Sequence, residues 1–195
     1  MLFFTSDSHF NDNYLIKREN RPFKNAKEGD SNLIKIWNKQ AKKGDTIYVI
    51  GDFISYGEYH KDIYLKGILN IKKIKADVVL ILGNNEERLI KGEFNNSFEE
   101  FRNYCLCLGF KDVKKEEFLE IGNKKFYLNH YPKNHKDGYV NLFGHIHKLG
   151  GIYKPYGINI SCDVNFLQLH SYADILELLK QKEDTEKNAP DLLDY

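Results

Sequence analysis

The sequence predicts an α/β fold in one main domain. Its first half alternates short, apolar, β-branched runs with stretches of helical apolar spacing, as in 46–50 followed by 63–74. After Gly109 the pattern changes to short alternating strands, of which 118–121 and 125–129 flank a hairpin turn. With 195 residues, of which 42% are hydrophobic and 29% charged, the chain is large enough for a core of its own.

The elements follow from apolar periodicity and from capping residues. Strands are expected at 2–5, 46–50, 78–82, 110–113, 118–121, 125–129 and 139–143, with a last pair at 157–163 and 166–169. Helices are expected from a cap at Asp30 or Ser31 to Ala41, at 63–74, from the cap Ser97 to Leu108, and from the cap Ser171 to Lys182. The polar stretch 11–29 is expected to be a loop with room for one short helix.

Charge, cysteines and hydropathy limit the class of protein. Lys plus Arg is 29 and Asp plus Glu is 28, so the balance predicts no general attraction to nucleic acid or to anionic membranes. The apolar runs are too short to span a membrane, and the start lacks the basic region of a signal peptide. Cys105, Cys107 and Cys162 lack metal-binding spacing and are expected to be reduced packing residues. We therefore expect a cytoplasmic protein with a domain at 1–183 and a charged tail at 184–195, and leave its oligomeric state open.

Two pairs of polar residues follow apolar strands with the same spacing. His145 and His147 come directly after the strand at 139–143, and Asp7 and His9 follow the first strand. On an extended backbone, side chains two residues apart point the same way, so each pair can face one spot. Imidazole and carboxylate groups that meet in this way suit a divalent metal. An Asp that caps a turn beside an exposed His is the alternative for each pair.

Three more polar residues follow strands in the same manner. Asp52 comes after 46–50, at the strand end where open α/β sheets place active sites. Asn84 follows 78–82, although Gly-Asn is also a common turn, and His130 follows 125–129. The resulting set of candidate ligands is Asp7, His9, Asp52, Asn84, His130, His145 and His147. Seven ligands are too many for one ordinary site, so we expect two metals that share a bridging carboxylate, with Asp52 as the central candidate.

The order of these blocks resembles that of the calcineurin-like metallophosphoesterases. The blocks are Asp7-Ser8-His9, Gly51-Asp52, Gly83-Asn84-Asn85-Glu86, His130 and Gly144-His145-Ile146-His147. The segments Arg21-Pro22-Phe23 and Asp163-Val164 resemble a small bacterial and phage-type branch of that family.

The resemblance implies a four-layer α/β/β/α sandwich, with two mixed β-sheets flanked by helices. It also implies that Asp7, His9, Asp52 and His147 hold one metal, and that Asp52, Asn84, His130 and His145 hold the second. Mn²⁺ is the first expectation, with Fe, Zn, Ni or Mg as alternatives. The implied activity is phosphoester hydrolysis, in which a metal-bridging hydroxide attacks phosphorus in line. Its catalytic residues are expected to be Asp52, Asn84, Asn85 and His130.

The sequence departs from the family at Asn85, where the family commonly has a histidine that protonates the leaving group. Asn cannot transfer a proton at neutral pH, and general acid catalysis is typically worth about 10²–10⁴-fold. Another histidine, His135 or His60, could supply the proton; substrates with good leaving groups or phosphodiesters could do without it; or turnover could be weak or absent. A second departure is Asn11-Asp12, where close relatives of this branch are expected to have Gly-His.

We therefore expect a metal-dependent phosphoesterase that acts on phosphodiesters or nucleotide-type substrates rather than on monoesters. Substrate contacts are expected from Arg21, Asn85 and His135. The alternative is a catalytically weak or inactive metal-binding scaffold that retains the fold. A nuclease is less favoured because the charge of the chain is balanced. The expected partner is a small phosphoester or nucleotide substrate. No membrane is expected, and nucleic acid is possible but not favoured.

Overall fold

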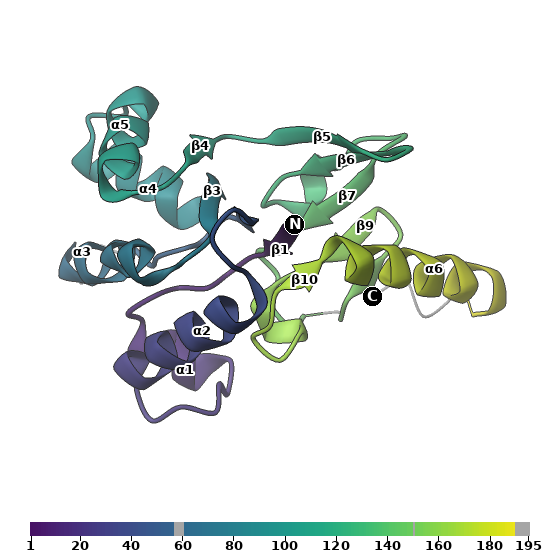
Figure 1. The fold of residues 1–195 in the computed structure, drawn as a ribbon, viewed down its shortest axis with the longest axis horizontal. Coiled ribbons are helices and arrows are strands. Elements are labelled where there is room, and N and C mark those ends of the chain that lie inside the picture. Colours follow the sequence, from purple (N-terminus) through teal and green to yellow (C-terminus); the bar gives the residue numbers. More distant parts are fainter. Residues whose placement is uncertain (57–60, 150, 190–195) are drawn as a thin grey trace.

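The computed structural model describes residues 1–56, 61–149 and 151–189, which form two five-stranded mixed sheets with helices around them (Figure 1). The first sheet has the order β10-β1-β2-β3-β4, with β10 antiparallel to β1 and the other pairs parallel. Its strands are β1 (Leu2–Thr5), β2 (Thr46–Ile50), β3 (Asp77–Ile81), β4 (Asp112–Lys114) and β10 (His170–Ser171).

The second sheet has the order β5-β6-β7-β9-β8, in which β6, β7 and β9 are parallel and both edge strands are antiparallel to their neighbours. Its strands are β5 (Glu117–Ile121), β6 (Lys124–Leu128), β7 (Val140–Phe143), β8 (Tyr153–Lys154) and β9 (Gly157–Asn159). The helices are α1 (Asn13–Arg18), α2 (Ala26–Gln40), α3 (Lys61–Ile68), α4 (Asn84–Glu93), α5 (Phe98–Leu108) and α6 (Tyr172–Asn188). Short 3₁₀ turns are η1 (Leu69–Lys73), η2 (Pro132–Asn134) and η3 (Cys162–Val164).

Each face of the first sheet has its own core. On one face, β2 and β3 pack with the helical layer, which buries Trp37 of α2 and Phe101 of α5 completely. On the other face, Phe4 and Ile81 pack with side chains of the second sheet such as Leu142, and α6 adds Ile175. The alternation of strand side chains between these cores gives β1 to β3 their near-continuous apolar sequences. The predicted α/β fold with two mixed sheets flanked by helices is confirmed.

The strand registers place the carboxyl ends of the sheets together. Thr5 pairs with Val49 and Ile50 pairs with Ile81, so β1, β2 and β3 end side by side. The loop after β7 reaches the first sheet: the backbone nitrogen of His145 lies 3.1 Å from both carboxylate oxygens of Asp7, which follows β1. The segments that follow β1, β2, β3 and β7 therefore converge on one edge of the molecule.

Three helical segments differ from expectation. Helix α2 begins at Ala26 rather than at Asp30 or Ser31, because the side chain of Asn25 caps it by accepting from the N–H of Glu28 at 3.0 Å. Helix α4 was not predicted; for Gly83-Asn84 the sequence offered only a ligand after a strand or, alternatively, a turn. The helix expected at 63–74 is divided between α3 and η1.

The strand pair expected at 157–163 and 166–169 is wrong. Strand β9 ends at Asn159 and pairs with β7 and β8, and η3 follows. Phe166 and Leu167 have φ angles of 49° and 65°, which are incompatible with an extended strand. Helix α6 continues past Lys182 to Asn188, so the first residues of the expected tail are helical, while 190–195 lie outside the described residues.

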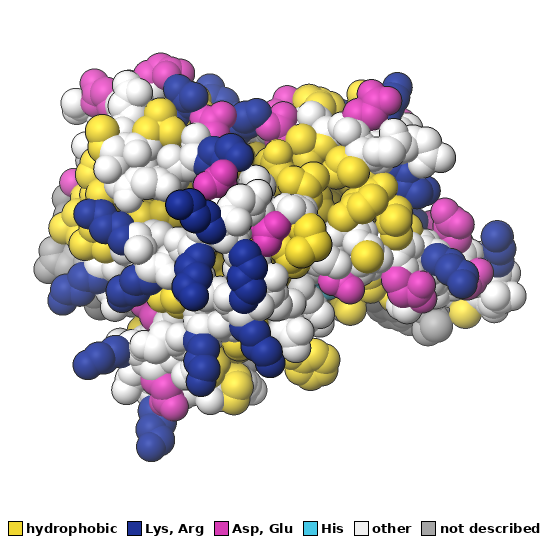
Figure 2. Space-filling view, viewed as in Figure 1, with side chains coloured by type: hydrophobic (Ala, Val, Ile, Leu, Met, Phe, Trp, Pro, Cys, Tyr) yellow, Lys and Arg dark blue, Asp and Glu magenta, His cyan; other side chains and the backbone are white. Residues whose placement is uncertain are grey.

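Positive charge is unevenly distributed over the surface. On the face shown in Figure 2, Lys and Arg side chains gather over α2 and α3, and apolar side chains gather over the second sheet. The whole chain nevertheless has a formal net charge of only +1. Among the described residues no helix combines the length and the apolar character needed to cross a membrane.

Candidate metal centre

The structure brings all seven predicted ligands to the edge where the strands end. Five of them have left-handed backbone conformations, with φ between 48° and 73°, at Asp7, His9, Asp52, His145 and His147. The predicted convergence is therefore achieved by tight turns and not by the side-chain alternation of an extended strand. Non-glycine residues in this region cost of order 1–3 kcal/mol each, and such strain is typical of functional sites.

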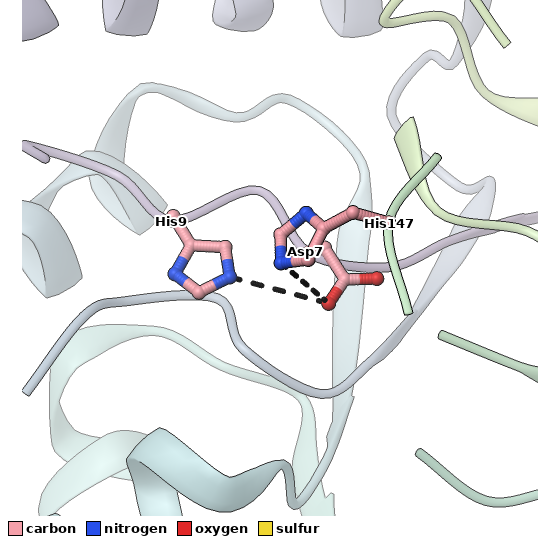
Figure 3. Close-up of side chains that lie close together, drawn as sticks. All are labelled: Asp7, His9 and His147. Carbon is pink, nitrogen blue, oxygen red and sulfur yellow. Dashed lines mark ion pairs between the residues drawn. The ribbon is translucent and has the colours of Figure 1, made fainter. Parts of the chain in front are cut away.

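The first group consists of Asp7, His9 and His147, whose ligand atoms lie within 4.8 Å of one another. Nε2 of His9 and Nε2 of His147 lie 4.0 Å and 3.8 Å from Oδ1 of Asp7, and Figure 3 shows both rings directed at that oxygen. The two rings are stacked with their centroids 5.1 Å apart. Burial, together with the neighbouring His147 and Arg21, lowers the pKa of His9, which favours the neutral, ligating imidazole.

The second group surrounds Asp52. Oδ2 of Asp52 lies 3.6 Å from Nε2 of His130 and 3.5 Å from Nε2 of His9. Oδ1 of Asn84 lies 3.3 Å from Nε2 of His130 and 2.9 Å from Nδ1 of His145. The Asp52 carboxylate thus stands between an imidazole of the first group and one of the second.

The histidine nitrogens fit a metal. Nε2 of His9 is buried without a hydrogen-bond partner among the described residues, while Nδ1 donates to Ser55 Oγ at 2.8 Å, which in turn donates to Asp12 Oδ2 at 2.6 Å. Nδ1 of His130 donates to the carbonyl of Ile50 at 2.9 Å, so Nε2 of the neutral ring is an acceptor. Each ring therefore presents a lone pair to the site, as histidine ligands do when their other nitrogen is held by a neighbouring acceptor.

Asp163 holds His147 in the same way and was not predicted as a site residue. Its Oδ2 accepts from Nδ1 of His147 at 2.7 Å, and its two oxygens accept from Nε and Nη2 of Arg21 at 2.8 and 2.9 Å. Burial opposes ionisation of Asp163, but the hydrogen bonds from His147 and Arg21 outweigh it and hold the pKa of this carboxyl well below its usual range. The sequence signal was Asp163-Val164, which had been noted only as a family resemblance.

Glu86 is a second residue without a predicted role. Its fully buried carboxylate accepts from the backbone N–H groups of Gly83, Asp52 and Phe53, each at 2.9 Å. It thereby joins the turn after β2 to the first turn of α4. Burial and the neighbouring Asp52 raise the pKa of Glu86 to about 7.

Asn85 also forms hydrogen bonds with Asp52. Its Nδ2 donates to Asp52 Oδ2 at 2.7 Å, its backbone N–H donates to Asp52 Oδ1 at 3.0 Å, and its Oδ1 accepts from the N–H of Tyr56 at 3.0 Å. The side chain therefore orients the central carboxylate from within the site.

Two predicted substrate contacts lie elsewhere. Arg21 is buried and donates to Asp163 and to the carbonyls of Asp7 and Ser8, so most of its donors are already used. His135 is exposed, stacks on Tyr156 with centroids 5.5 Å apart, and lines a separate cavity. Neither residue lines the cavity beside the candidate ligands, their contact with substrate stays a prediction, and His60 lies outside the described residues.

The two groups of candidate ligands face a cavity of about 630 Å³. Five of its lining residues are His9, Asp52, Asn84, His145 and His147. Burial, which disfavours charge, raises the pKa of Asp52, while the neighbouring His130 opposes this shift. Bound cations would reverse the effect of burial, because they stabilise the carboxylate form.

Comparison with known proteins agrees with this geometry. Residues 2–193 match the family of calcineurin-like phosphoesterases, and the chain belongs to this family. The uncharacterized protein MJ1445 of Methanocaldococcus jannaschii is 31% identical over 150 residues, which are 75% of this chain and 69% of the relative.

Two solved structures match the chain, and the first of them has a similar fold. A protein of unknown function, AQ665 from Aquifex aeolicus, has a TM-score of 0.62 and 20% identity, covering 91% of this chain and 98% of its own. YfcE, a phosphoesterase from E. coli, has a TM-score of 0.43 and 14% identity, covering 82% and 77%. From its family and its candidate ligand groups, the chain is a metal-dependent phosphoesterase.

Proposed function

We propose that the chain is a di-metal phosphoester hydrolase that prefers phosphodiesters or nucleotide-type substrates to unactivated monoesters. The observation that carries the proposal is the position of Asp52 Oδ2, 3.5 Å from His9 Nε2 and 3.6 Å from His130 Nε2. A single carboxylate oxygen between two imidazoles suits a bridge between two cations.

The two groups define the proposed ligand sets. Asp7, His9 and His147 would hold one cation, Asn84, His130 and His145 would hold the other, and Asp52 would contact both. Carboxylate, amide and imidazole ligands together suit Mn²⁺. When bound, two such cations supply positive charge for the phosphoryl oxygens and lower the pKa of water at the centre.

The preference for diesters rests on Asn85. Its amide is held between Asp52 and the backbone of Tyr56, and it cannot donate a proton to a leaving alkoxide. His135 lines a different cavity and is not placed to replace it. Substrates whose leaving groups need no proton, such as activated diesters, lose least from this arrangement.

The test compares bis-(p-nitrophenyl) phosphate, whose leaving group needs no proton, with the unactivated monoester glycerol 2-phosphate on chelator-stripped protein reloaded with Mn²⁺. We expect metal-dependent turnover with a preference for the diester, and loss of turnover in Asp52→Asn. The matched control is Asp77→Asn, because Asp77 forms an exposed ion pair with Lys111. Absence of metal-dependent turnover across a broad phosphoester panel would refute the hydrolase proposal.

A second variant tests the role of Asn85. Asn85→His restores a group that can transfer a proton, so turnover of glycerol 2-phosphate, whose alkoxide leaving group needs one, is expected to rise relative to that of bis-(p-nitrophenyl) phosphate, by at most about 10²–10⁴-fold. If the variant still binds Mn²⁺ and the ratio is unchanged, proton transfer to the leaving group does not set the substrate preference.

A further inference from the structure

Arginine is scarce in this lysine-rich chain and is concentrated near the metal centre. The arginines are Arg18, Arg21, Arg88 and Arg102. Arg21 holds Asp163, and Arg102 forms an ion pair with Asp112. Arg18 and Arg88 both line the cavity above the candidate ligands. Because the planar guanidinium matches phosphate geometry better than the lysine ammonium does, this placement points to recognition of an anion.

Among the described residues, no carboxylate competes for Arg88. It lies in α4 one turn beyond Asn84, and the positions three and four residues before and after it are Asn, Asn, Lys and Gly. The adjacent Glu87 accepts from the hydroxyl of Tyr131 at 2.6 Å. Within the described ranges no acidic side chain pairs with Arg88, so its charge is available to the cavity.

Helix α1, which lines the same cavity, supplies a second arginine and an aromatic ring. Arg18 uses Nε to donate to Glu19 Oε1 at 2.7 Å. Tyr14, four residues earlier and therefore on the same helix face, lines the same cavity and is 70% exposed. An exposed aromatic side chain of this kind can stack on a nucleobase.

We propose that Arg88, with Arg18, forms a second anion subsite beside the metal centre. The substrate is accordingly a phosphodiester of nucleotide type that carries a further phosphate on its alcohol portion. The inference rests on the proposed hydrolase function and adds the substrate class: the metal ligands take the scissile phosphate and the arginines take the second phosphate.

The test uses two chromogenic substrates with the same scissile bond and leaving group. They are thymidine 5′-(4-nitrophenyl phosphate) and its 3′-phosphorylated counterpart, which differ in one phosphate. The Mn²⁺-loaded protein is expected to prefer the 3′-phosphorylated substrate by about tenfold or more in kcat/KM, mainly through KM, because a uniformly bound anion lowers KM.

Variants assign the preference to Arg88. In Arg88→Ala the ratio of the two kcat/KM values is expected to fall to about one. In Arg88→Lys the ratio is expected to be intermediate, because the charge remains while the planar, two-donor geometry of the guanidinium is lost. The control Arg102→Ala, which removes an arginine outside this cavity, is expected to keep the wild-type ratio. A wild-type ratio near one, or a preference that survives in Arg88→Ala, would overturn the inference.

A binding measurement without turnover distinguishes failure of the anion subsite from failure of the hydrolase proposal. Calorimetry on Mn²⁺-loaded protein compares thymidine 3′,5′-bisphosphate with thymidine 5′-monophosphate. Tighter binding of the bisphosphate that disappears in Arg88→Ala supports the subsite even if neither ester is hydrolysed. Equal binding of both nucleotides contradicts the subsite, whether or not bis-(p-nitrophenyl) phosphate is turned over.

Discussion

Asp163 accepts a hydrogen bond from Nδ1 of His147 at 2.7 Å while both of its oxygens are bound by Arg21. The contact places the His147 proton on Nδ1 and leaves Nε2 facing Asp7 at 3.8 Å. The Arg21–Asp163 pair thus connects the loop after α1 and the turn at η3 to a candidate ligand that neither segment contains.

Loss of this contact should weaken metal binding. Asp163→Asn keeps the shape but removes the charge that orients His147, and substitutions of this type typically lower metal affinity about 10–100-fold. Competition with a chromogenic chelator measures the change. Asp112→Asn, which breaks the ion pair with Arg102 instead, is the control. Equal affinities in both variants would mean that Asp163 has no orienting role.

Glu86→Gln should destabilise the fold. The carboxylate accepts three backbone N–H groups at 2.9 Å, and an amide would turn a donor toward at least one of them. The expected loss is about 1–3 kcal/mol in the free energy of unfolding, measured with urea. Glu87→Gln, on the exposed face of the same helix, should change stability little, and a similar loss in both variants would contradict this explanation.

Gly144→Ala should disturb the candidate metal centre. A Cβ atom at this position would contact Ser6 Oγ and lie 2.5 Å from Asp7 Oδ2. Reduced Mn²⁺ affinity is expected together with about 1–3 kcal/mol of destabilisation. In the control Gly29→Ala the nearest atom is Ile16 Cδ1 at 2.9 Å, the end of a flexible side chain, so metal affinity should stay unchanged. Normal affinity in Gly144→Ala would refute the close approach.

Acid should destabilise the protein through His170. Burial lowers the pKa of this histidine to about 4, against about 6.5 in the unfolded chain, so the unfolded state binds the proton first as the pH falls. Stability is therefore lost between about pH 6.5 and 4, and His170 accounts for about 2 kcal/mol between pH 7 and 5. Urea unfolding at both pH values should show this loss reduced in His170→Leu but not in a His135→Leu control. An identical loss in all three proteins would exclude His170 as the cause.

The positions of most strands along the chain and the identity of the clustered polar residues could be predicted because both depend on local patterns. β2 was predicted with its observed bounds, since the run Thr46–Ile50 is β-branched and flanked by Gly44-Asp45 and Gly51-Asp52. Helix α5 was also predicted correctly, because Ser97 and Gly109 are unambiguous capping residues.

Features that depend on distant contacts could not be predicted. Helix α4 starts at a Gly-Asn sequence typical of turns, and the buried Glu86 that stabilises its first turn bonds to the segment after β2. The roles of Arg21 and Asp163 depend on contacts across 142 residues of sequence. The left-handed conformations of Asp7, His9 and Asp52 occur at residue types that tolerate positive φ, but residue type alone does not locate them.

The candidate ligands belong to segments that follow β1, β2, β3, β6 and β7, so they meet only after the two sheets have docked. An unfolded chain holds no such site, and metal therefore binds the native state preferentially. By mass action, binding at one site adds about 2.7 kcal/mol to stability at a free metal concentration one hundred times its dissociation constant. Metal supply consequently governs how much of the protein persists in folded form as well as how much of it is active.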